Sequence, residues 1–529
     1  MAARHRRNVL ALASGTLLSR GSGFLRTLTA AYVLGFTPLA DAFNLANTLP
    51  NSLYDLVIGG VVSASFVSVF VQRLTLDGER KAWRSISSVV TLTLVILTLA
   101  SALVWLAAGP IVTVMTSLNH SGLPHKAVDL AAQRAATVTF LRWFAPQIFL
   151  YGLLGIAGVL LAVRGRFGVS AYAPVANNVI AIGVLVWFHV VAPGASIHSV
   201  SGGSELAWLA GGTTLGLLAQ FAVMMPALAT SRLGKLRLRW DFHNEAVRGV
   251  LAMGGWTLVV VVANQVALYV VLALAFGLGG DGPISAYTYG WAFMQMPFAV
   301  VVLSVFSALG PELVELHTKN EHDAFTQRLR QALVMSLQII IPISLTLIVL
   351  SQPLVAVLLN RADGSKVLNV GIALAVLAAG LPGFTIYQVV SRALQAQLRG
   401  RDIAFLALGQ NLGAVVLAWS IGRHSVGGLM ASISVSYSVA ALCGVFLLSH
   451  RGVSLSPALM DQRLRSTAVI GVGAALAGAV GYSSSASTMG WGLISRLVVA
   501  VLCAITAVLM VLVWRVRRSK LERPNRVKV

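Results

Sequence analysis

The sequence predicts an all-α polytopic membrane protein with about fourteen transmembrane helices. Of its 529 residues, 57% are hydrophobic and 11% are charged, whereas soluble globular proteins carry about 25% charged residues. The apolar residues form successive runs long enough to cross a hydrocarbon core of ~30 Å, which needs roughly 20 residues per helix. The basic residues are concentrated in alternate loops between these runs. This composition excludes an average soluble enzyme.

Short polar segments separate the apolar runs and set the limits of each predicted span. The predicted spans are residues 9–35, 39–72, 85–115, 130–163, 170–192, 206–230, 246–277, 283–316, 330–359, 367–398, 402–422, 426–449, 466–483 and 488–514.

The distribution of charge predicts the orientation of the chain. Lys and Arg number 39 against 17 Asp and Glu, a formal net charge of +22. With the N-terminus in the cytoplasm, 28 of the 39 basic residues fall in cytoplasmic segments and four in external loops. We therefore expect a membrane protein with both termini in the cytoplasm. The basic charge would face anionic membrane lipids rather than nucleic acid.

A short internal repeat predicts the division into lobes. Pro146, Tyr151 and Arg164-Gly165-Arg166 of the fourth span recur in the tenth as Pro382, Tyr387 and Arg399-Gly400-Arg401, with an offset of 236 residues at the proline. Chance can produce so short a pattern, but both copies have the same rank in their half, and transporters are commonly duplicated. We expect two pseudo-symmetric six-helix lobes, residues 1–235 and 236–455, followed by two C-terminal helices and a basic tail in residues 456–529.

Few charges lie inside the spans, where each one is costly and is usually paired or placed in a cavity. The set considered for substrate binding comprises Arg20, Arg26, Asp41, Arg142 and Arg392, and Asp55 is also intramembrane. Arg20 lies about 22 Å from the external turn near Gly35, and Asp55 returns to a similar depth on the second span. These two residues are therefore candidates for a pair.

Structural alternatives exist for the same residues. Arg20 and Arg26 would also serve as snorkelling or salt-bridged side chains, although the depth of Arg20 argues against snorkelling. Asp41 lies in the first turn of the second span, where a carboxylate would cap the helix. The sequence leaves capping and substrate binding equally open for Asp41.

The sequence contains no catalytic or metal-binding signature. It has no HExxH, Walker or GxSxG motif and no His/Cys ligand cluster. Its two cysteines, Cys443 and Cys503, both lie in apolar runs. We therefore expect a protein that is not an enzyme and that has no cofactor and no bound metal.

The first seventy residues resemble a known family. The matching segments are Arg20-Gly21-Ser22-Gly23-Phe24-Leu25-Arg26, Gly35, Ala40-Asp41-Ala42-Phe43, Leu49-Pro50-Asn51 and Phe66-Val67-Ser68-Val69-Phe70. They are similar to the start of the MurJ (MviN) family of lipid II flippases, within the multidrug/oligosaccharidyl-lipid/polysaccharide (MOP) exporter superfamily, and the sequence is actinobacterial in style.

The resemblance implies a function in peptidoglycan synthesis and cell-wall biogenesis. Lipid II, an undecaprenyl-pyrophosphate-linked disaccharide-pentapeptide, would be flipped to the outer leaflet by alternating access through a central cationic cavity. The thirteenth and fourteenth spans would form a groove for its lipid tail. Arg20 and Arg26 match the family's cavity arginines, and Asp41 matches its acidic residue.

The chain also departs from the family pattern. Tyr54 and Asp55 stand where the family often has an arginine, and Ala292, beside Trp291, stands near another such position. These three residues are expected to tune the cavity, and Arg142 and Arg392 to supply the missing positive charge. Because acids for a sodium site are lacking, the membrane potential is the expected driving force, worth about 2.3 kcal/mol per charge per 100 mV.

Three alternative functions follow from the same sequence. The chain would instead flip another polyprenyl-linked saccharide, or export drugs in exchange for cations, although the deep arginines of the first span disfavour cation binding. It would otherwise be a transport-inactive scaffold that recruits cell-wall synthesis and division proteins. A scaffold would tolerate Arg20→Ala, whereas a flippase should not.

Overall fold

The computed structural model describes residues 2–54, 70, 78–117, 130–200, 204–231, 234, 236–241, 255–278, 282–359, 364–488 and 495–504. Within these ranges the regular elements are helices, without any β-strand. Ten of the described helices are long and apolar enough to cross a membrane. The prediction of an all-α polytopic membrane protein is confirmed.

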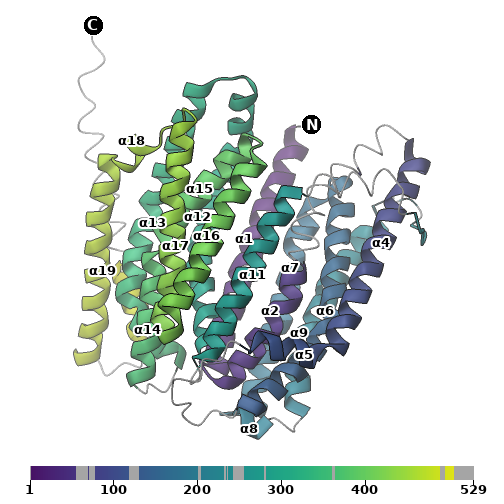
Figure 1. Cartoon of the computed structure of the whole chain (residues 1–529), viewed down its shortest axis with the longest axis horizontal. Helices are drawn as coiled ribbons and strands as arrows, with labels where there is room; N and C mark the ends of the chain where they lie inside the picture. Colours follow the sequence, from purple (N-terminus) through teal and green to yellow (C-terminus); the bar gives the residue numbers. More distant parts are fainter. Residues whose placement is uncertain are drawn as a thin grey trace. The chain divides into compact units, whose positions relative to one another are not determined.

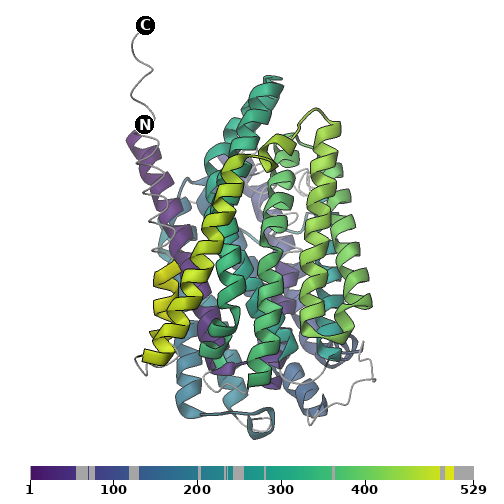
Figure 2. The same cartoon turned by 90° about the vertical axis from the view of Figure 1, so that its left-hand side faces the viewer.

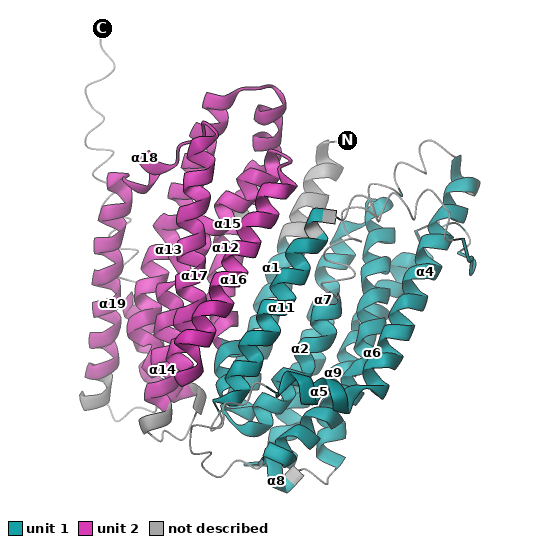
Figure 3. Cartoon of the chain, in the orientation of Figure 1, with its two compact units in different colours: residues 1–289 teal, residues 290–529 magenta. Residues whose placement is uncertain are grey.

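The chain forms two compact units, residues 1–289 and 290–529 (Figure 3). The lobes predicted from the sequence are residues 1–235 and 236–455. These boundaries stay a prediction. Unit 1 contains α1 (Ala2–Leu34), α2 (Pro38–Tyr54), α4 (Gly78–Leu106), α5 (Ala108–Met115), α6 (Leu130–Val163), α7 (Phe167–Val191), α8 (Ile197–Val200), α9 (Ser204–Ala229), α11 (Gly255–Gly277) and the start of α12 (Pro283–Thr318) (Figure 1).

Unit 2 begins within α12 and continues to the C-terminal part of the chain. It contains α13 (His322–Leu359), α14 (Gly364–Ala379), α15 (Leu381–Ala396), α16 (Gly400–Ser420), the 3₁₀ turn η2 (Gly422–His424), α17 (Val426–His450), α18 (Ser456–Leu459), α19 (Gln462–Thr488) and the helical segment Ser495–Ala504 (Figure 2).

Where the structure describes them, the predicted spans agree closely with these helices, except that two are broken. Much of the predicted spans 39–72 and 488–514, and the start of 246–277, lies outside the described residues. The third predicted span is divided at Ala107 into α4 and α5, and the tenth is divided at Gly380 into α14 and α15. Pro382 favours the second break because proline fits the first turn of a helix. Gly380 also lies against α17, where an added Cβ would approach the Cβ of Ser434 to 2.5 Å. Pro382 and the close contact of Gly380 with α17 therefore both favour a break at this point.

In unit 1, small and polar residues bring α1 against α7. The two hydroxyl oxygens of Ser14 and Tyr172 are 2.6 Å apart, and Asn178 Nδ2 donates to Ser22 Oγ at 2.9 Å. The residue numbers of these two pairs increase in the same order along both helices, so α1 and α7 run parallel. The other main contacts of the unit join α7 to α9, and α6 to α2, α4 and α9.

In unit 2, α17 is the helix around which several others assemble. It packs on α14, α15 and α16, while α13 packs on α14 and α19. Ser434 on α17 donates its hydroxyl to the carbonyl of Val376 on α14 at 3.0 Å. That hydrogen bond adds to the close approach at Gly380.

The repeated motif is visible as two helix ends of the same geometry. After α6, Arg166 N donates to Leu161 O at 2.9 Å, with Gly165 in the left-handed region at φ +69°. After α15, Arg399 N donates to Leu394 O at 2.9 Å, with Leu398 at φ +57°. Both are Schellman-type ends. The geometry thus aligns Arg166 with Arg399. The sequence motif instead aligned Arg164 with Arg399, and that alignment was wrong by two residues.

Leu398 provides a test of this turn because a left-handed conformation costs an L-residue roughly 1–2 kcal/mol, which glycine avoids. We expect Leu398→Gly to stabilise the protein by about 1 kcal/mol, since this side chain is 86% exposed and gives up little packing. The reciprocal change Gly165→Leu should destabilise it by a similar amount. Thermal unfolding of the detergent-purified chain checks both variants. A lower melting temperature for Leu398→Gly would contradict the strain argument.

Candidate functional site

Arg20 and Arg26 lie on α1 and are both accessible. The contact face of α1 toward α7 includes Ser22 and Gly23, and Arg20 is exposed while Arg26 is partly buried. Within the described ranges, no hydrogen bond or ion pair joins either guanidinium to another side chain. Asp55, the candidate partner of Arg20, lies outside the described residues. Both arginines therefore have donors that remain available to an anion.

Asp41 lies in a buried polar cluster at the start of α12. Its Oδ1 accepts hydrogen bonds from Ser285 N at 2.7 Å and Ser285 Oγ at 2.6 Å, and its Oδ2 accepts one from Ile284 N at 3.4 Å. Asn44 Nδ2 donates to Ser285 Oγ at 3.1 Å. Asp41 is 2% exposed and Ser285 is fully buried. The carboxylate therefore caps the N-terminus of α12 as well as lying in the first turn of α2.

The chain enters this cluster through a capped turn. Gly35 adopts φ +64° after α1, and Thr37 Oγ1 accepts a hydrogen bond from Ala40 N at 3.1 Å. Thr37 is thus the N-terminal cap of α2 by the side-chain criterion. Because Thr37 satisfies this end of α2, the Asp41 carboxylate is available to α12, 243 residues further along the chain.

Arg142 and Arg392 lie in different units and are both exposed. The Arg142 guanidinium carbon is 5.9 Å from the centroid of the Trp105 ring, a cation–π contact between α6 and α4. Arg392 Nη1 donates to Gln395 Oε1 at 3.0 Å. Arg392 also lines a pocket of about 420 Å³ between α15 and α12, next to Gly310 and Pro311. A cationic group therefore faces an open cavity in unit 2.

The three positions expected to tune the cavity have different placements. Tyr54 is the last residue of α2, and Asp55 lies outside the described residues. Ala292 is partly buried on α12, next to Trp291. Trp291 belongs to an aromatic cluster in unit 2, with ring centroids 5.7 Å from Phe384 and 6.0 Å from Tyr437. The aromatic cluster is therefore formed by the residue that precedes Ala292 in the sequence.

Sequence reasoning missed two features of the site. It gave Asp41 no distant partner, because nothing near Ser285 in the sequence indicates that it will meet α2. It also treated Arg84, Arg237 and Arg239 only as part of the cytoplasmic charge excess, whereas the structure gathers them around one pocket. The alternation of apolar and basic residues over 236–240 was a signal that would have identified this segment.

A sequence model of a family described as lipid II flippase MurJ matches residues 30–502. The chain belongs to the MurJ family. A lipid II flippase MurJ of Burkholderia cenocepacia is 27% identical over 457 residues, which cover 84% of each chain. The family resemblance expected from the first seventy residues thus extends over most of the sequence.

The fold of this chain is similar to the folds of two solved transporters. A lipid II flippase MurJ in an inward closed conformation matches with a TM-score of 0.72 and 17% identity, over 94% of this chain and 98% of that chain. An inward-facing MATE-family multidrug resistance transporter of the MOP superfamily matches with a TM-score of 0.64 and 13% identity, over 83% and 96%. At these identities the matches show the fold alone, which this chain shares with a transporter of the MOP superfamily.

The buried cluster at Asp41 yields a prediction that separates capping from substrate binding. Asp41→Ala removes the acceptor of the Ser285 N–H and hydroxyl, so we expect a loss of about 1–3 kcal/mol in the free energy of unfolding. Asp41→Asn keeps one acceptor oxygen and should lose less. Thermal unfolding of the purified variants checks the order. An unchanged melting temperature for Asp41→Ala, together with lost transport, would show that Asp41 serves the substrate instead.

Proposed function

We propose that this multi-pass membrane protein flips lipid II from the inner to the outer leaflet of the bacterial cytoplasmic membrane, by alternating access, for peptidoglycan synthesis. The family match over residues 30–502 carries the proposal. Membership of the MurJ family also favours lipid-linked substrates over the cation-coupled drug export expected of a multidrug antiporter. The predicted orientation, with both termini in the cytoplasm, belongs to the same proposal.

The chemistry of lipid II explains why arginines in the membrane would be needed. Its pyrophosphate is anionic and cannot enter a hydrocarbon core alone, whereas its polyprenyl chain remains in the lipid. Guanidinium groups bind phosphate oxygens through paired charge-assisted hydrogen bonds. Arg20 and Arg26 on α1 have such donors available, and we assign them to the pyrophosphate.

Arg142 and Arg392 are assigned supporting roles in the same path. Each is exposed, and each lies on a helix that also carries a copy of the repeated proline motif, α6 and α15. Their charge would compensate for the arginines that are absent at Tyr54 and Ala292. Asp41 would act indirectly, by holding the first turn of α12 against α2.

Removal of either α1 arginine should strongly reduce transport. In a bacterium depleted of its own lipid II flippase, the parent chain should restore lipid II to the outer leaflet. We expect Arg20→Ala and Arg26→Ala each to lower that exposure at least about tenfold, because a hydrogen bond to a charged group is worth roughly 1.5–3 kcal/mol. Arg465→Ala, an exposed arginine at the start of α19, is the matched control and should behave as the parent.

The two possible failures have different meanings. If a well-inserted parent chain does not restore lipid II exposure, the substrate is another polyprenyl-linked saccharide or the chain is a scaffold. If the parent restores exposure and both α1 variants do so equally at equal membrane levels, the pyrophosphate is bound elsewhere.

A second measurement tests the compensating arginines. We expect Arg142→Ala and Arg392→Ala each to reduce the rate of lipid II exposure severalfold without changing the amount of protein in the membrane. Arg392→Lys should retain more activity than Arg392→Ala, since it keeps the charge beside the pocket. Full activity in both alanine variants would refute compensation.

A further inference from the structure

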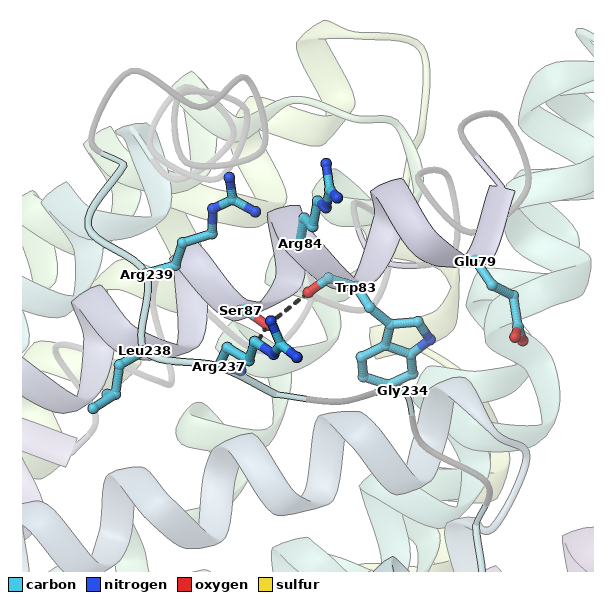
Figure 4. A pocket seen from close by; sticks show the side chains of 8 residues that line it. All are labelled: Glu79, Trp83, Arg84, Ser87, Gly234, Arg237, Leu238 and Arg239. Atoms are coloured by element: carbon cyan, nitrogen blue, oxygen red, sulfur yellow. Dashed lines mark hydrogen bonds between the residues drawn. The ribbon is translucent and has the colours of Figure 1, made fainter.

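A second basic site lies in unit 1, between α4 and the extended segment 236–241. It is a pocket of about 850 Å³ (Figure 4). The described residues that line it are Glu79, Trp83, Arg84, Ser87, Gly234, Arg237, Leu238 and Arg239. These residues lie apart from the α1 arginines, and the transport proposal assigns them no role.

Two hydroxyl groups of α4 hold the segment in place. Arg237 N donates to Ser87 Oγ at 3.3 Å, and Arg239 N donates to Thr91 Oγ1 at 3.1 Å. Four residues of a helix and two residues of an extended chain both advance by about 6–7 Å, so the two spacings match. Each hydroxyl also donates to a carbonyl of α4 at 2.7 Å. Each hydroxyl therefore donates to its own helix and accepts from the segment, which fixes the segment to α4.

Gly234 permits the close approach of the chain to α4. A Cβ at this position would overlap the indole ring of Trp83, which is only 5% exposed. The Arg164 guanidinium carbon is 5.6 Å from the centroid of the same ring. The indole N–H of Trp83 has no acceptor within the described ranges. The pocket thus combines a fixed wall with an unused buried donor.

The described lining of the pocket carries a net positive charge. Arg84, Arg237 and Arg239 line it, and Glu79 is the one acid among its described residues. Glu79 Oε1 is 3.2 Å from Arg164 Nη2, so that carboxylate already has a cation. Figure 4 shows Arg84 and Arg239 extending to the same side. The positive charges of three guanidinium groups that line one pocket repel one another and would be stabilised by an anion.

The opposite face of the same segment is apolar and open. Leu236 is 43% exposed, Leu238 is 83% exposed and Trp240 is 66% exposed. In an extended chain, successive side chains point to opposite faces, and in Figure 4 Leu238 points away from Arg84 and Arg239. Tryptophan and leucine beside arginine are typical of a segment that lies at a membrane–water interface.

From the basic pocket and its apolar outer face, we propose that the segment 236–241 and α4 bind the phosphate of an anionic lipid headgroup at the membrane surface. The apolar face contacts the acyl chains while Arg84, Arg237 and Arg239 bind the phosphate. This site is distinct from the diffuse attraction of basic loops for anionic lipid, because its arginines share one pocket. The proposal does not depend on which lipid the chain transports.

The test uses the full chain in lipid nanodiscs with a fluorescent label at Leu238→Cys. Cys443→Ser and Cys503→Ser leave that position as the one reactive thiol. Brominated phosphatidylglycerol and brominated phosphatidylcholine, at equal mole fractions, then quench the label according to their local concentration. We expect stronger quenching by the anionic lipid, and we expect Arg237→Gln with Arg239→Gln to lower its apparent preference roughly tenfold.

Arg463→Gln with Arg465→Gln is the matched control. These two exposed arginines have the same spacing and lie in unit 2, so their substitution removes the same charge from another place. The control should leave the lipid preference at Leu238 unchanged. A label at Met460→Cys, where the native side chain is 72% exposed, should show a weaker preference that does not respond to Arg237→Gln with Arg239→Gln.

Three results would overturn the proposal. Equal loss of preference in the two double variants would mean diffuse electrostatics. Absence of quenching at Leu238 by either lipid would mean that the segment does not touch the membrane. Equal quenching by the two lipids, together with binding of inorganic pyrophosphate that Arg237→Gln with Arg239→Gln removes, would mean that the pocket takes a soluble anion.

Discussion

The hydrogen-bonding requirement of a polypeptide in an apolar solvent is the constraint on which this structure depends. Inside a bilayer no water is available to unpaired N–H and C=O groups, so the chain must be helical and its polar side chains must find partners nearby. Thr91, Thr93 and Thr137 each donate to the carbonyl four residues earlier. Where a helix begins or breaks in a buried place, a partner from elsewhere is needed, and Asp41 supplies one to the first turn of α12.

The limits of the helices could be predicted from sequence because they depend on local hydropathy and local turn chemistry. The predicted span 130–163 has the same limits as α6, and 426–449 differs from α17 by one residue at its end. The breaks at Ala107 and Gly380 were missed, since neither interrupts the apolar run. Gly380 breaks its span partly because α17 lies close to it, and such a contact is a property of the folded chain.

The candidate site was less predictable than the fold for the same reason. A charge within a span identifies Arg20, Arg26 and Asp41 without any knowledge of their neighbours, because burial of charge is costly wherever the helix lies. The hydrogen-bond partners of a site residue are set by contacts between distant segments. Asp41 meets Ser285 across 244 residues, and the backbone N–H of Arg237 meets Ser87 across 150. No pattern of spacing in the sequence encodes either pair.

The hydrogen bonds of the arginines separate those that hold the fold from those available to a ligand. Arg166 donates to Ala227 O and Thr230 O at the end of α9, Arg330 donates to Ser454 O, and Arg451 pairs with Asp402. These contacts satisfy backbone carbonyls and one carboxylate, so these guanidinium donors are already used within the fold. Arg20, Arg26, Arg84, Arg237 and Arg239 have no such side-chain partner within the described ranges. An excess of basic residues on one side of a membrane therefore need not act as one uniform anchor, because folding divides it into structural arginines and arginines left for phosphate.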